Sequence, residues 1–127
     1  MYLPKLEEVS FSIETHWEDV PVLDHFSDGL ELGKDLEKRV LDRIDSGDSW
    51  AWCTVEVIGN FEGCKGSEFL GCCSYLDEND FKEGGYWEDM KQEAYRELVL
   101  NVFTSEQKKL GLELVECLQA VEDRNYR

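Results

Sequence analysis

The sequence predicts an α+β fold, a small antiparallel β-sheet of about three strands packed against about three helices in the order β-α-β-β-α-α. Three observations predict this class. The chain has 127 residues, 42% of them hydrophobic, which is enough for one core. Two stretches rich in aromatic and β-branched residues follow one another, and apolar residues recur at helical spacing before and after them. We therefore expect a single acidic α+β domain over residues 1–127.

The first elements follow from short patterns. Residues 9–13, VSFSI, alternate between apolar and polar and predict a short strand. Residues 16–29 contain a proline and a glycine and indicate an irregular segment. Apolar residues at helical spacing then predict a helix over residues 30–45, which ends near Ser46-Gly47. Its apolar positions are Leu32, Leu36, Val40, Leu41 and Ile44.

A hairpin is predicted in the middle of the chain. Residues 49–60, SWAWCTVEVIGN, indicate a central strand, in which alternation places Trp50 and Trp52 on one face. The following NFEGCKGSE contains two glycines and indicates the connection, and residues 68–75 indicate the return strand. Gly71 marks a bulge or a close approach of another group.

Helices are predicted for the remainder. A short helical turn begins after Tyr75, capped by Asp77 or Asn79, and Gly84-Gly85 interrupts it. A helix over residues 86–103 has the buried stripe Trp87, Met90, Ala94, Leu98 and Val102. Thr104 to Gln107 fits a capping box, which predicts a separate last helix. Its inward positions are Leu110, Leu114, Leu118 and Val121.

The charge is the most informative property of the sequence. With 29 acidic and 13 basic residues, the formal net charge is −16, whereas a small domain is comfortable at a magnitude of about 2–8. Direct binding of nucleic acid is disfavoured, because phosphate contacts need Lys and Arg, and an anionic membrane surface is excluded on the same logic. The surplus lies in residues 1–33 and 44–104, while residues 34–43 and 105–127 are nearly neutral. A basic partner is favoured.

The sequence also indicates a compartment. The start, MYLPKLEEVSF, has no basic region followed by an apolar run, and no stretch approaches 18 apolar residues. The cysteines are odd in number and form no CxxC motif, which does not suit a disulfide framework. They are Cys53, Cys64, Cys72, Cys73 and Cys117. We expect a reduced, cytoplasmic protein whose cysteines act mostly as small buried hydrophobes, with Cys72 and Cys73 on opposite strand faces.

The candidate partner-binding surface lies in the acidic stretch over residues 76–99. Asp89, Glu93 and Glu97 are four residues apart and form a ridge, where like charges cost about 0.2–0.5 kcal/mol per pair. A rigid array of carboxylates can imitate the phosphates of a duplex, and neighbouring aromatic rings can anchor an interface. The predicted binding residues are Asp77, Glu78, Asp80, Glu83, Tyr86, Trp87, Glu88, Asp89, Glu93 and Glu97. The alternative is a solvated helix face preceded by capping acids.

A resemblance supports the first interpretation. GCCSY followed by DENDF and GGYWEDMKQEA, within residues 49–99, resembles small phage or plasmid proteins. Small size, strong acidity and an α+β pattern are similar to phage-encoded host-defence inhibitors of the anti-CRISPR and anti-restriction classes. No functional residue carries over by motif. The resemblance implies a non-enzymatic viral inhibitor in the host cytosol. Its target would be a Cas effector or another defence nuclease, blocked by DNA mimicry or allosterically.

Two other functions remain open at this point. One is an acidic adaptor or assembly protein that docks through an aromatic and apolar patch around Tyr86 and Trp87. The other is a small metal-dependent hydrolase built on His16 and His25 with nearby acids, although their spacing matches no standard zinc pattern. No nucleotide-binding or catalytic motif occurs, so we expect no cofactor, no resident metal and no enzyme. If the first acidic surface is not the binding face, the next candidates are Glu14, Glu18, Asp19, Asp24 and Asp28.

Overall fold

The computed structural model describes residues 2–22 and 31–125. Its strands and helices follow the order β-α-β-β-α-α, which confirms the predicted α+β class. A turn of 3-10 helix, η1, comes first at Leu6–Glu8. The other elements are β1 (Ser10–Trp17), α2 (Glu31–Asp45), β2 (Cys53–Phe61), β3 (Cys64–Cys73), α3 (Glu78–Glu83) and α4 (Trp87–Asn125). No helix within the two described ranges has both the length and the apolar character that crossing a bilayer requires.

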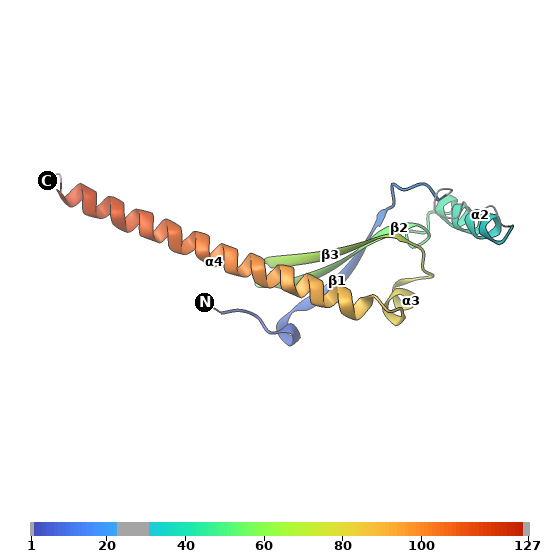
Figure 1. Cartoon of the computed structure of the whole chain (residues 1–127), viewed down its shortest axis with the longest axis horizontal. Helices are drawn as coiled ribbons and strands as arrows, with labels where there is room; N and C mark the ends of the chain where they lie inside the picture. The colour runs from blue at the N-terminus through green and yellow to red at the C-terminus, as the bar shows by residue number, and fades with distance from the viewer. Residues whose placement is uncertain (1, 23–30, 126–127) are drawn as a thin grey trace.

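The three strands form one antiparallel sheet in the order β1-β2-β3, so β2 is central as predicted. Alternate residues of β2, namely Cys53, Val55 and Val57, are fully buried in the main core. β1 extends past its predicted end and includes His16 and Trp17, because both residues pair with the start of β2. Figure 1 shows α4 crossing one face of this sheet, with α2 at one end of the molecule.

The connection between β2 and β3 is shorter than the predicted segment over residues 60–68. Glu62 and Gly63 have φ angles of 45° and 82°, and two consecutive left-handed residues make the tight turn that suits the twist of paired strands. Pairing resumes at once with Phe61 opposite Cys64. The prediction was wrong in length, because two residues are enough to reverse the chain.

The predicted irregularity at Gly71 is confirmed as a bulge. Cys53 pairs with Cys73 but Val55 pairs with Leu70, so β3 carries an extra residue here. The Glu18 carboxylate holds the bulge, because its Oε2 accepts hydrogen bonds from the Thr54 hydroxyl at 2.6 Å and from the Cys72 N–H at 2.8 Å. A Cβ at Gly71 would lie 3.2 Å from this oxygen.

α4 packs on the sheet through the stripe that the sequence predicts. Met90, Ala94, Leu98 and Val102 are all buried. The contact between the two backbones is direct at Gly66 of β3, where a Cβ would lie 2.2 Å from the Leu98 nitrogen and 2.4 Å from the Ala94 oxygen. Glycine is therefore the residue that allows this helix to approach the sheet.

α3 adds an aromatic cluster to the main core. The Asp77 carboxylate caps the helix by accepting a hydrogen bond from the Asp80 N–H, which confirms one of the two predicted caps. Phe81 of α3 is fully buried. Its ring lies 5.2 Å from Tyr75, 6.0 Å from Trp50 and 6.3 Å from Trp87 between centroids.

α2 joins the end of the sheet through a second, smaller core. Trp52 packs with Val22 and Val40, and its Nε1 donates to the Val20 carbonyl at 2.7 Å. Trp50 instead packs in the main core. The prediction that Trp50 and Trp52 share one face of the central strand was wrong, because both precede the start of β2 and follow the turn after α2.

Residues 87–125 form one continuous helix, so the predicted break at Thr104 was wrong. The Thr104 hydroxyl donates to the Leu100 carbonyl at 2.8 Å, a bond that a threonine inside a helix can make instead of capping one. The C-terminal part of α4 extends beyond the sheet (Figure 1). The residues predicted to point inward there are exposed, namely Leu110, Leu114, Leu118 and Val121.

Candidate partner-binding surface

The ten residues predicted to bind a partner lie on α3, on the loops beside it and on the first turns of α4. Two of the acids are used by the fold itself. Asp77 Oδ1 accepts the Asp80 N–H at 2.9 Å, and Asp80 Oδ2 accepts the Leu76 N–H at 2.9 Å. Backbone donors are neutral, so these hydrogen bonds stabilise the start of α3 without bringing a cation to either carboxylate.

Three other acids of this surface have cationic partners on the same helix. The ion pairs are Glu78–Lys82 at 3.9 Å, Glu88–Lys91 at 2.9 Å and Glu93–Arg96 at 3.0 Å. These pairs neutralise charge locally. The predicted ridge of three carboxylates on α4 is therefore interrupted at its middle member.

Glu83, Asp89 and Glu97 are exposed and make no ion pair within residues 2–22 and 31–125. Together with Asp77 and Asp80 they leave five carboxylates without a cation. We call these five residues the uncompensated acids. They are what remains of the predicted acidic surface once local pairing is taken into account.

The two aromatic residues of the prediction differ in availability. Trp87 is partly buried against Phe81, and the Lys82 and Lys91 ammonium groups lie 5.3 Å and 4.8 Å from its ring centroid. Its π-face is therefore already in contact with cations of its own chain. Tyr86 is 52% exposed and remains accessible to another molecule.

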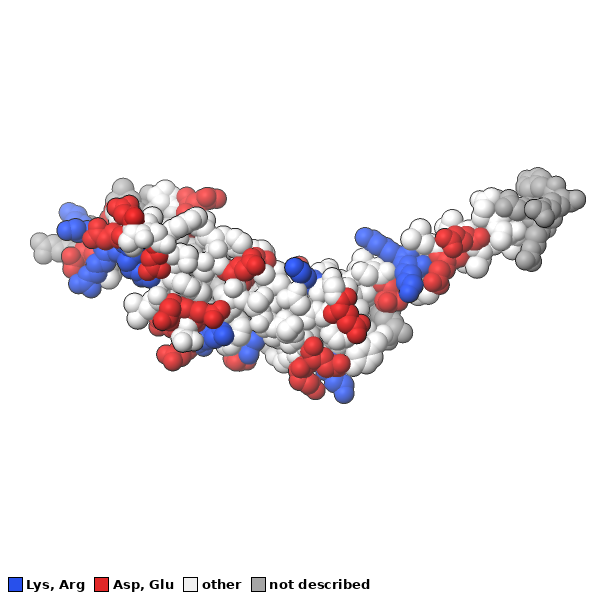
Figure 2. Space-filling view, turned by 180° about the vertical axis from the view of Figure 1, so that it is seen from behind, with Lys and Arg blue, Asp and Glu red and all other residues white. Residues whose placement is uncertain are grey.

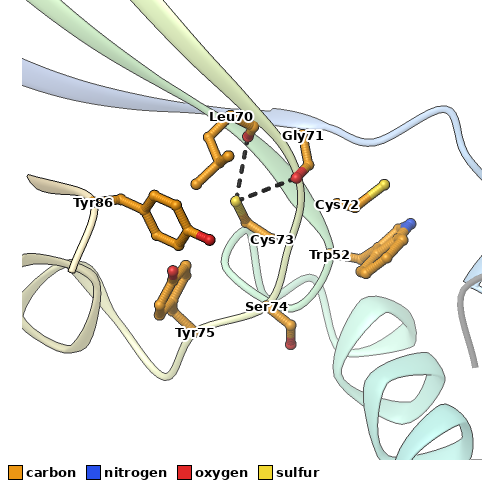
Figure 3. Close-up of a pocket in the computed structure, with 8 residues that line it drawn as sticks. All are labelled: Trp52, Leu70, Gly71, Cys72, Cys73, Ser74, Tyr75 and Tyr86. Carbon is orange, nitrogen blue, oxygen red and sulfur yellow. Dashed lines mark hydrogen bonds between the residues drawn. The ribbon is translucent and has the colours of Figure 1, made fainter. Parts of the chain in front are cut away.

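Tyr86 borders a cavity of about 350 Å³ at the bulged end of β3. Figure 3 shows Tyr75 and Tyr86 on one side of Cys73, and Trp52 and Cys72 on the other. Burial raises the pKa of Tyr75, and the nearby Asp80 carboxylate adds to this rise. No local sequence pattern indicates this cavity, because the bulge and the turn before β2 bring its walls together.

On one face of the molecule, the acidic side chains are less concentrated than the sequence suggests. On the face shown in Figure 2, acidic side chains form several separate groups over the body of the molecule. Lys and Arg lie among them near α2 and along the C-terminal part of α4. On this face the acidic side chains are therefore spread over several groups.

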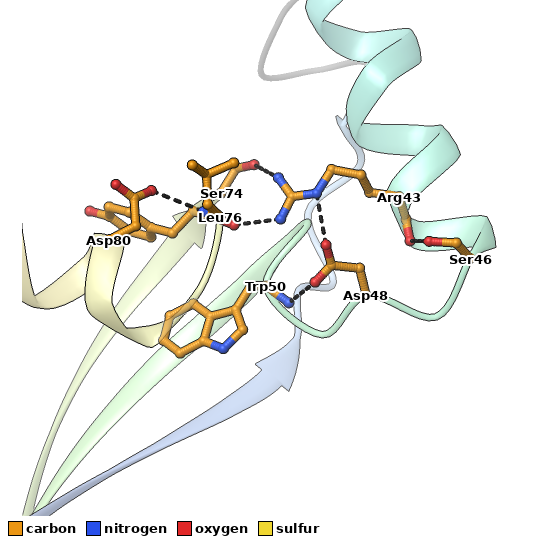
Figure 4. Close-up of polar contacts among 8 residues, drawn as sticks. Arg43, Ser46, Asp48, Trp50, Ser74, Leu76 and Asp80 are labelled. Atoms are coloured by element: carbon orange, nitrogen blue, oxygen red, sulfur yellow. Dashed lines mark hydrogen bonds and ion pairs between the residues drawn. The ribbon is translucent and has the colours of Figure 1, made fainter.

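A network around Arg43 fixes the position of α2. Its guanidinium donates to Asp48, to Ser74 and to the Tyr75 carbonyl (Figure 4). Asp48 Oδ1 also accepts the Trp50 N–H at 3.0 Å. These bonds connect the end of α2 with the segment that leads to α3, so Arg43 supports the rim of the cavity.

The structure places His16 beside acids other than those that its sequence neighbourhood indicates for a metal site. Glu14, His16 and Glu56 have potential ligand atoms within 4.8 Å of one another, because Glu14 and Glu56 are directly opposite each other in the register. The His16 Nε2 already contacts Glu56 Oε1 at 2.8 Å. A divalent cation bound through the His16 Nε2 would replace this contact. His25, Asp24 and Asp28 lie outside the described residues.

The other candidate acids near the N-terminus also have defined environments. The Glu18 carboxylate accepts the hydrogen bonds that hold the bulge. The bond from the Thr54 hydroxyl holds the pKa of Glu18 below its ordinary value. Asp19 is exposed. The alternation of β1 could have indicated that Glu14 and His16 share the polar face, but the cross-strand register was needed to add Glu56.

The core cysteines are not suited to nucleophilic chemistry. Burial raises the pKa of Cys53 to about 12 and that of Cys73 to about 11, and the thiolate is the reactive form. Cys73 packs in the main core with Cys53, while Cys72 packs against the Trp52 cluster. The prediction that Cys72 and Cys73 face opposite sides is confirmed.

Comparisons of the chain with models of protein families, with curated proteins and with solved structures find no match.

Proposed function

We propose that this chain is a non-enzymatic acidic inhibitor that binds the positively charged nucleic-acid-binding surface of a host defence nuclease or CRISPR effector by mimicking DNA. The observation that carries the proposal is the set of uncompensated acids on α3 and α4. Glu83, Asp89 and Glu97 make no ion pair within the described residues, and of the three only Asp89 lies in the first turn of a helix, where the helix dipole favours an acid. A basic partner surface would gain a favourable charge interaction with each of these carboxylates.

The cavity beside Tyr86 supports a protein partner. Aromatic rings with a carboxylate nearby attract an Arg or Lys side chain through cation–π and charge interactions. Tyr75 and Tyr86 line the cavity, and Asp80 is close enough to influence Tyr75. A basic side chain of the partner would enter here while the acids of α4 meet its neighbours.

Charge reversal tests the proposal without disturbing the caps. The variant Asp89→Lys with Glu97→Lys changes two exposed residues of α4 that make no ion pair in the described chain. The matched control is Glu113→Lys with Glu116→Lys, on the same helix with the same change of charge. Immobilised protein is incubated with bacterial lysate, and captured nucleic-acid-binding proteins are then eluted with duplex DNA. We expect the first variant, but not the control, to lose these proteins.

The salt dependence of capture separates this function from docking through apolar surface. Binding through charges weakens steeply as ionic strength rises, whereas apolar docking does not. Proteins that resist elution by DNA and by salt, and that bind both variants equally, would overturn the proposal. They would favour the second candidate, an acidic adaptor or assembly protein. The exposed apolar residues of α4 are the specific observation in favour of that second function.

A further inference from the structure

The C-terminal part of α4 exposes apolar side chains that no other described element covers. Phe103, Leu110, Leu114, Leu118 and Val121 are between 45% and 61% exposed. A helix in water obtains most of its stability from packing of an apolar face, and a contiguous exposed apolar patch marks an interaction surface. This segment therefore lacks the contact that would normally stabilise it.

Four of these side chains belong to a heptad repeat, and Leu118 lies outside it. Leu100, Gln107, Leu114 and Val121 are seven residues apart, and so are Phe103, Leu110 and Cys117. The two series alternate at spacings of three and four, which is the a/d pattern of a coiled coil. We call these seven residues the outer stripe. At about 100° per residue, they lie on the side of α4 opposite the buried stripe, so a second helix can approach without meeting the sheet.

We propose that the outer stripe is a dimer interface, in which α4 of a second copy of this chain packs in antiparallel orientation. Charge is the reason for choosing a second copy in this orientation. Residues 105–127 carry five acidic and four basic residues, so this segment is nearly neutral. The surplus of negative charge lies in the rest of the chain. Antiparallel packing places the two acidic bodies at opposite ends of the paired helices, whereas parallel packing would bring them together.

The repeat also fits this orientation in detail. In an antiparallel pair centred near Leu112, Leu114 of one copy lies opposite Leu110 of the other, and Val121 lies opposite Phe103. The remaining layer places Gln107 opposite Cys117. The helices overlap over about 20 residues, or about 30 Å, which exceeds the Debye length of about 8 Å at physiological salt. Repulsion between the acidic bodies is then largely screened.

The oligomeric state of the full chain tests the interface. Sedimentation equilibrium should give a dimer for the wild type and a monomer for Leu110→Glu with Leu114→Glu. The matched control is Leu112→Glu with Val115→Glu, because these residues are 65% and 62% exposed but lie outside the outer stripe. The control should remain a dimer. Circular dichroism and near-ultraviolet spectra establish that the body of each variant is folded.

Three results overturn the proposal. A wild-type chain that stays monomeric at about 100 μM would mean that the outer stripe serves a different protein or none. A dimer that survives Leu110→Glu with Leu114→Glu would place the interface elsewhere. Loss of the dimer in the control as well would mean that the outer stripe does not specifically determine dimer formation.

Cross-linking tests the orientation separately. With copper(II) phenanthroline as the oxidant, two thiols lose two electrons and two protons and form one disulfide. In Gln107→Cys, the antiparallel pair should give a link between residue 107 of one copy and Cys117 of the other, identified by peptide mapping. A Cys117–Cys117 link in the wild type, or a dimeric Gln107→Cys chain without the 107–117 link, overturns the antiparallel arrangement.

Discussion

Arg43 at the end of α2 and Asp48 in the turn that follows are joined by a hydrogen-bonded ion pair of 2.8 Å between Nε and Oδ2. The same guanidinium reaches Ser74 and the Tyr75 carbonyl. One side chain therefore connects α2 with the segment between β3 and α3. Both charged groups are partly buried, so this pair is less screened than an exposed one.

Replacing this arginine should weaken the fold. Arg43→Ala removes hydrogen bonds to a charged partner and to a carbonyl, and we expect a loss of about 2 kcal/mol in the free energy of unfolding. Arg39→Ala is the matched control, because Arg39 forms an exposed pair with Asp35 at 3.4 Å and its removal should cost less than about 0.5 kcal/mol. Urea denaturation measures both. Equal losses would show that the Arg43 network has no special role.

The pH dependence of stability should depend on Asp48. The Trp50 N–H, and then Arg43, hold the pKa of this carboxyl below its ordinary value. A lowered pKa in the folded state stabilises the protein above the unfolded pKa of about 3.9, and this contribution is lost as the pH falls through the folded value. We expect Asp48→Asn to be less stable than the wild type at pH 7 and to lose less stability between pH 5 and pH 2. Urea denaturation at several pH values measures this.

The exposed Asp42→Asn on α2 provides the control for this pH series. It removes a carboxylate near the end of the same helix, and we expect it to keep the wild-type stability at pH 7. If Asp48→Asn lost as much stability between pH 5 and pH 2 as the wild type does, this result would contradict the role given to Asp48.

The contact between β3 and α4 can be tested at Gly66. An alanine Cβ there would meet the backbone of Leu98 and Ala94 at less than 2.5 Å, so either the helix or the strand has to move. We expect Gly66→Ala to cost about 3 kcal/mol or more in unfolding free energy. A Cβ at Gly85 meets no atom within 4 Å, so Gly85→Ala should be nearly neutral. A thermal scan that ranks the two variants equally would contradict this packing.

Thiol reactivity should follow burial. Cys117 is exposed, whereas Cys53 and Cys73 are buried and have raised pKa values. In the monomeric variant Leu110→Glu with Leu114→Glu, where no second copy covers Cys117, alkylation by iodoacetamide at pH 8 and peptide mapping should modify Cys117 first and leave Cys53 and Cys73 unmodified until denaturant is added. Fast modification of Cys73 in the folded protein would show that the bulge opens readily.

Several elements could be predicted because their signals are local. Alternating β-branched residues identified β2, Asp77 identified the start of α3, and the stripe from Met90 to Val102 identified the buried face of α4. Each of these patterns is set by a few neighbouring residues, and burial in one core is consistent with all of them. The turn before β2 was not predicted. The alternating pattern of the strand extends back through Trp50 and Trp52 in the sequence, whereas the strand itself begins only at Cys53.

The end of α4 shows a different limit. Apolar residues at helical spacing, such as Leu110 and Leu114, normally indicate burial, but the described chain has no further surface that covers them.

The acidic surface was also only partly predictable. The structure pairs Lys91 with Glu88 and Arg96 with Glu93. Which carboxylates remain uncompensated depends on side-chain geometry that the sequence does not contain.

The two-residue turn at Glu62 and Gly63 has a consequence for the order of folding. β2 and β3 are neighbours in sequence, whereas β1 pairs with β2 across the long connection that contains α2. Closing a short loop costs less chain entropy than closing a long one, and local contacts form faster. The β2–β3 hairpin should therefore gain protection in pulsed hydrogen exchange before β1 does. Simultaneous protection of all three strands would show that β1 joins the nucleus.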